Sequence, residues 1–109
     1  MTWKIKFYDG VLQSVLGMPP GIQARIIKLL ELIATHGGNL GAPHTKSLGS
    51  GLFELRAKSA EGIGRVIFCY TKSSSVFMLI AFVKKSQKLP LKELKQARKR
   101  QNEVTLHDS

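Results

Sequence analysis

The fold is decided by residues 76–100, which read VFMLIAFVKKSQKLPLKELKQARKR. An almost wholly apolar run comes first, as expected of a central strand that is covered on both faces. Two lysines end this run, a third lysine follows, and Pro90 precedes a segment with a narrow apolar stripe at helical spacing. The stretch therefore predicts a buried strand followed by a basic helix, with the chain fraying from about Gln101.

Two further strand-like runs precede this stretch, at residues 52–58 and 64–72. Short links that contain serine or glycine separate the three runs, so an antiparallel meander is the expected pairing. Upstream of them, residues 37–51 include five glycines and are expected to form a loop.

The N-terminal part predicts one strand and two helices. Residues 3–8 alternate between apolar and polar side chains, which indicates a half-buried strand. Residues 11–16 form a short predicted helix, and residues 22–33 carry apolar side chains on one face of a longer one. The predicted fold class is therefore α+β in the order βααβββα. It has one antiparallel sheet, an N-terminal helical hairpin on one face, and a C-terminal basic helix.

Length and charge limit the class of protein. A chain of 109 residues is expected to form a single domain over residues 1–109. Its formal net charge of +10 favours an acidic partner, which can be a nucleic acid, an anionic membrane surface or an acidic protein. The only cysteine, Cys69, lies in an apolar run and predicts a buried thiol in a reducing compartment. Without a signal peptide or an apolar run long enough to span a membrane, the expected location is cytoplasmic.

Several kinds of chemistry have no support in the sequence. One cysteine and three scattered histidines do not have the spacing of metal ligands. The seven acidic residues contain no close pair typical of a two-metal nuclease, and no glycine-rich phosphate loop runs from a strand into a helix. The sequence therefore predicts neither a metal site nor a cofactor.

Basic side chains are expected to converge at one rim of the sheet. Arg56 lies near the end of one predicted strand and Arg65 near the start of the next, so a hairpin brings them close together. Lys84 and Lys85 end the third strand beside Arg65, and Lys88 follows. Each cation alone is most simply a solvated surface charge. Their convergence favours an anion site, because like charges repel.

Two other residues near this rim have alternative interpretations. Glu54 is more simply an ion-pair partner that positions an arginine than a catalytic base. Phe82 can stack on a nucleic acid base or pack against the neighbouring strand.

Four motifs together resemble a known family. They are residues 46–48 (KSL), 51–56 (GLFELR), 64–68 (GRVIF) and 81–90 (AFVKKSQKLP). In this order they are similar to the RelE/ParE superfamily of toxins, most of all to its phage-derived, HigB-like branch. The resemblance spans about residues 3 to 100.

This resemblance implies a type II toxin with a small RelE-like fold. Its partners are expected to be a cognate antitoxin, often a helix-turn-helix protein of the HigA kind, and the ribosome with its mRNA. The implied activity is a metal-independent endoribonuclease that cleaves mRNA on the ribosome and so inhibits translation and growth. Two alternatives stay open. One is a ParE-like toxin that poisons DNA gyrase, and the other is a non-catalytic domain that binds nucleic acid through its basic helix.

On the ribonuclease interpretation, Arg56 and Arg65 are expected to clamp the scissile phosphate, because a guanidinium matches phosphate geometry. Lys84, Lys85 or Lys88 would supply the general base or acid, with His44 as a weaker candidate. The expected RNA-binding residues are Lys46, Phe82, Lys92, Lys95, Arg98 and Lys99.

Overall fold

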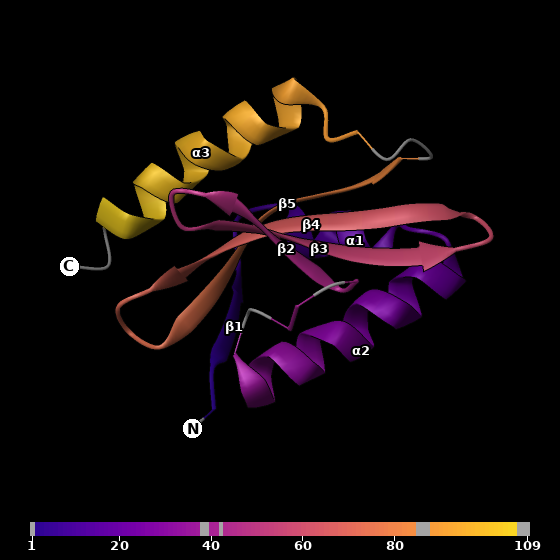
Figure 1. The fold of residues 1–109 in the computed structure, drawn as a ribbon, viewed down its shortest axis with the longest axis horizontal. Helices are drawn as coiled ribbons and strands as arrows, with labels where there is room; N and C mark the ends of the chain where they lie inside the picture. The colour runs from indigo at the N-terminus through magenta and orange to yellow at the C-terminus, as the bar shows by residue number, and fades with distance from the viewer. Residues whose placement is uncertain (1, 38–39, 42, 85–87, 107–109) are drawn as a thin grey trace.

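Strands and helices follow one another along the chain in the order drawn in Figure 1. The computed structural model describes residues 2–37, 40–41, 43–84 and 88–106. Its elements are β1 (Lys4–Phe7), α1 (Val11–Leu16), α2 (Pro20–His36), β2 (Thr45–Gly49), β3 (Leu52–Ser59), β4 (Gly62–Thr71), β5 (Ser75–Lys84) and α3 (Leu91–Leu106). Every predicted strand and helix is present, and the α+β class is confirmed.

The observed order is βααββββα, with four consecutive strands where the sequence predicted three. Residues 37–51 were expected to form a loop, yet β2 pairs antiparallel with β3. This strand is only five residues long and has glycines on both sides. A turn with positive φ at Gly49, Ser50 and Gly51 joins it to β3. Short length and glycine-rich flanks obscured the strand in the sequence.

The prediction of a wholly antiparallel sheet was wrong for β1. The five strands lie in the order β1-β5-β4-β3-β2, and β1 pairs parallel with β5. The other three pairs are antiparallel. Alternation of side chains along a segment indicates a strand, but it contains no information about the direction of the neighbouring strand.

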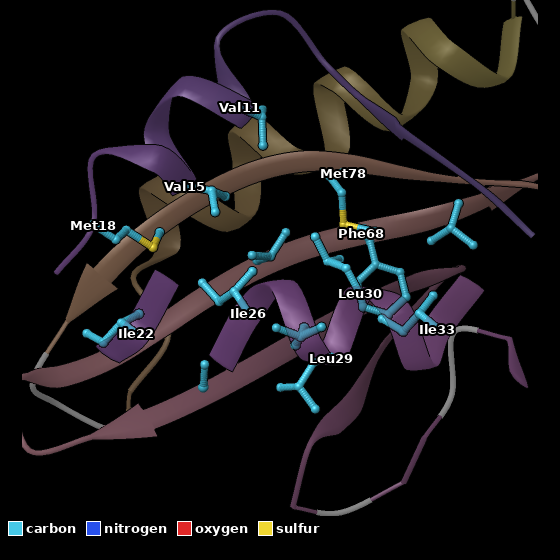
Figure 2. Packing of buried hydrophobic residues seen from close by; sticks show 14 residues of the cluster. Val11, Val15, Met18, Ile22, Ile26, Leu29, Leu30, Ile33, Phe68 and Met78 are labelled. Atoms are coloured by element: carbon cyan, nitrogen blue, oxygen red, sulfur yellow. The ribbon is translucent and has the colours of Figure 1, made fainter. Parts of the chain in front are cut away.

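The helices cover both faces of the sheet (Figure 1). Figure 2 shows side chains of α1 and α2 packed against those of the strands, with Ile22 and Ile26 of α2 in the core that also contains Phe68 of β4. A Cβ atom on Gly64 of β4 would lie 2.3 Å from the Ile22 side chain. Glycine at this position therefore lets α2 approach the sheet closely.

Helix α3 covers the opposite face, over a smaller core that includes Leu52, Ile67, Cys69, Leu79, Ile80 and Ala97. Ala97 is the only buried residue among those of α3 that the structure describes, so polar contacts supplement this narrow seam. Arg100 donates to a carbonyl of β5 at 2.7 Å, and Gln101 donates to a carbonyl of the β2–β3 turn at 2.8 Å. The predicted fraying from about Gln101 was wrong, because these contacts hold the last turns of the helix. None of the helices seen in the described residues has the length and apolar character needed to cross a membrane.

Candidate functional site

A buried carboxylate forms the centre of the candidate site. Glu54 of β3 is 0% exposed, and carboxylates are almost never fully buried unless they are paired. Its Oε1 accepts a hydrogen bond from Nε of Arg56 at 2.8 Å, and its Oε2 accepts one from Nη1 of Arg65 at 3.2 Å. The predicted pairing of Glu54 with an arginine is confirmed, and the carboxylate holds two of them.

The two arginines differ in their access to solvent. They lie directly opposite each other in the β3–β4 ladder, so their predicted proximity is confirmed. The Arg56 side chain is 22% exposed, whereas that of Arg65 is 0% exposed. In this structure an external phosphate can therefore reach Arg56 but not Arg65. Because two guanidinium groups share one carboxylate, the cluster keeps one positive charge in excess.

The strand register places further cations on the same face of the sheet, which is the face that α3 covers. Lys46 of β2 lies opposite Glu54. Phe82 of β5 lies opposite Arg65, and Lys84 follows it by two residues. Residues two apart in a strand share a face, so Lys46, Arg56 and Lys84 belong to one side of the sheet. Lys46 and Lys84 are both exposed.

The remaining residues of the predicted catalytic group occupy the segment between β5 and α3. Lys88 is exposed and lies three residues before α3 begins. Lys85 lies outside the described residues. Phe82 is half-buried and packs against the core beneath α3, which favours the packing role among the two that the sequence allowed.

The basic residues predicted to bind RNA through α3 divide into two groups. Lys92, Lys95 and Lys99 are exposed along the helix. Arg98 is half-buried, and its Nη2 donates to the carbonyl oxygen of Leu48 at 3.5 Å. Arg98 therefore helps to hold α3 against β2, while the three lysines are available to an external partner.

Two residues near Arg56 were missed or undervalued in the sequence. Lys58 is exposed, follows Arg56 by two residues and so lies on the same face; the alternation of β3 would have identified it. The N–H of Arg56 donates to the carbonyl oxygen of His44 at 2.9 Å, which places His44 directly across from Arg56. This position depends on β2, which the sequence did not predict.

The residues that the structure describes contain no group of three or more His, Cys, Asp and Glu side chains that could hold a metal ion. Burial raises the pKa of the Cys69 thiol to about 11, so the thiol stays protonated at neutral pH. A pocket of about 520 Å³ lies near the start of β5, lined by Tyr8, Phe77 and Glu103 among others, and none of the predicted site residues lines it.

The fold is similar to those of solved toxins. A double mutant of the E. coli toxin RelE in the free state matches with a TM-score of 0.68 and 13% identity, over 92% of this chain and 98% of that chain. The RelE–RelB complex of Pyrococcus horikoshii OT3 matches with a TM-score of 0.60 and 18% identity, over 81% of this chain and 100% of that chain. The RelBE2 toxin–antitoxin complex of Mycobacterium tuberculosis matches with a TM-score of 0.57 and 15% identity, over 77% of this chain and 100% of that chain. The predicted RelE-like fold is therefore confirmed.

No curated protein matches the chain. The model of one protein family, described as phage derived protein Gp49-like (DUF891), matches residues 13–102. The matched segment includes β3 and β4, which carry Glu54 and both arginines, and most of α3. The chain therefore belongs to the phage-derived Gp49-like family, and its fold is that of the RelE toxins.

Proposed function

We propose that the protein is the toxin of a type II toxin–antitoxin system and that it cleaves mRNA on the ribosome without a metal ion. The observation that carries this proposal is the group of cations around Glu54. Arg56 is partly exposed there, and Lys46, Lys58 and Lys84 belong to the same face of the sheet. Because like charges repel, such a group favours binding of an anion, and the phosphate of an RNA backbone is one.

Each cation has a place in metal-free RNA cleavage. The ribose 2′-oxygen attacks the neighbouring phosphorus, so negative charge builds up on the phosphorane and then on the departing 5′-oxygen. Arg56 would stabilise the phosphorane, and removing one such donor typically costs about 3 to 4 kcal/mol. Lys84, Lys85 or Lys88 would transfer protons to and from the two oxygens, with His44 as a further candidate. Arg65 would belong to the same unit through its bond to Glu54.

The proposed partners follow from the charge distribution and from the family. Lys92, Lys95 and Lys99 would contact the phosphates of ribosomal RNA, since they form an exposed basic surface on α3. A cognate antitoxin, expected to be a helix-turn-helix protein of the HigA kind, would neutralise the toxin. Two of the solved relatives are toxin–antitoxin complexes, which supports the existence of such a partner.

Cleavage of a short mRNA on purified ribosomes tests this function. The wild-type protein should cut the mRNA only when ribosomes are present. Arg56→Ala should lower the single-turnover rate by about 100-fold. Lys28→Ala is the matched control, because Lys28 is exposed on α2, which packs on the other face of the sheet. Cleavage by Arg56→Ala at the wild-type rate would contradict the assignment.

A further inference from the structure

Glu54 and Arg65 are buried groups that cannot reach RNA in this structure, yet they lie behind the exposed Arg56. We infer that Glu54 and Arg65 are positioning residues that fix the guanidinium of Arg56 in the orientation needed at the scissile phosphate. This inference rests on the proposed ribonuclease function. It divides the predicted arginine clamp into one residue that contacts the phosphate and one that acts through a carboxylate.

The geometry of the Glu54–Arg56 bond supports this division. The bond uses Nε of Arg56 at 2.8 Å, and Nε is the nitrogen nearest the side-chain stem. A hydrogen bond at this nitrogen restrains rotation of the planar guanidinium, whose terminal nitrogens lie farther out. Glu54 and Arg56 are two residues apart on one strand, so the strand itself holds the pair together. The exposed 22% of the Arg56 side chain is thus presented in a restricted orientation.

Arg65 fixes the second oxygen of the same carboxylate. Its Nη1 donates to Oε2 of Glu54 from the neighbouring strand, and this bond is fully buried. A buried carboxylate with a single partner would be poorly compensated, because desolvation of an ion costs several kcal/mol. Since β4 is a central strand, Arg65 connects Glu54 to the rigid middle of the sheet. The orientation of Arg56 therefore depends on two strands rather than on its own flexible side chain.

A structural role alone and a positioning role predict different kinetics. Glu54→Gln keeps the shape of the side chain but removes the charge that orients Arg56. In single-turnover cleavage on ribosomes, kcat should fall by about 100-fold, as expected when a catalytic group is displaced by about 1 Å. KM should stay unchanged, because ribosome binding depends on other residues. Glu61→Gln is the matched control, since Glu61 is exposed in the β3–β4 turn, and it should cleave at the wild-type rate.

A double-mutant cycle with Arg56→Ala shows whether Glu54 acts through Arg56. If it does, adding Glu54→Gln to Arg56→Ala should cause no further loss of rate. If the rate of the double variant instead falls by the product of the two single losses, the inference is overturned. A variant with both Glu54→Gln and Arg65→Met removes the buried carboxylate and the buried guanidinium together. It should unfold no more easily than the wild type and still cleave slowly; recovery of the wild-type rate in this folded variant would overturn the inference.

The same assay separates this inference from the proposed function. A wild-type rate in Glu54→Gln, with loss of cleavage in Arg56→Ala, overturns the positioning role and leaves the ribonuclease standing. Intact mRNA in the presence of the wild-type protein and ribosomes overturns both.

Discussion

Arg56 and Arg65 lie directly opposite each other in neighbouring strands and share the carboxylate of Glu54 between them. Two like charges in this register would repel each other without the carboxylate. The shared ion pair therefore belongs to the fold as well as to the proposed site.

We expect the stability of the protein to depend on this pairing. Glu54→Ala leaves Arg65 buried without its carboxylate, and breaking a buried pair in this way costs about 3 to 5 kcal/mol in the free energy of unfolding. Urea denaturation followed by the fluorescence of Trp3, whose ring lies tilted against that of Tyr70, would measure the change. A loss below about 1 kcal/mol, typical of an exposed pair, would mean that the cluster is not buried in solution.

The exposed lysines of α3 are expected to contribute binding rather than chemistry. Replacing Lys95 and Lys99 with Gln should raise KM for ribosomes and leave kcat unchanged. The dependence of log affinity on log salt concentration should become shallower by about 1 to 2 units, because two phosphate contacts are lost. The matched control replaces Arg25 and Lys28 of α2 with Gln, which removes equal charge from the other layer of the fold. Equal effects from both pairs would indicate attraction by net charge alone.

His44 is expected to take part in proton transfer during cleavage. It lies directly across from Arg56, and an imidazole can accept the 2′-OH proton. His44→Ala should therefore lower the single-turnover rate on ribosomes by about 100-fold, whereas His36→Ala, at the exposed end of α2, should cleave at the wild-type rate. A wild-type rate in His44→Ala would assign the proton transfer to the lysines.

Cys69 provides a test of how firmly α3 covers the sheet. The thiol is 1% exposed and lies in the core beneath α3, and burial raises its pKa from 9.0 to about 11. Folding thus favours the protonated thiol. The resulting stabilisation is fully present below pH 9 and is lost as pH rises towards 11. The free energy of unfolding should therefore fall less steeply over this range in Cys69→Ala than in the wild type.

Thiol labelling gives an independent measurement of how firmly α3 covers Cys69. The native protein should react with iodoacetamide only at the rate at which α3 opens. Glu103→Gln, which alters the contact between α3 and the hydroxyl of Tyr8, should increase that rate. Fast labelling of the wild type at neutral pH would show that Cys69 is not covered.

The sequence predicted the elements that show a clear pattern in consecutive residues. The apolar spacing of residues 22–33 defined α2, and two runs joined by a short link placed Arg56 beside Arg65. The burial of Arg65 was not predictable in this way, because burial depends on tertiary packing over this face of the sheet, where α3 packs from the far end of the chain. The position of His44 was also missed, since it depends on a short strand among glycines.

Mapping mRNA ends after brief induction of the protein tests the central claim most directly. Wild-type protein should generate new ends within translated coding regions, and Arg56→Ala, at equal protein level, should generate none. Intact mRNA during wild-type growth arrest, together with induction of DNA damage signalling, would contradict the account and favour gyrase as the target.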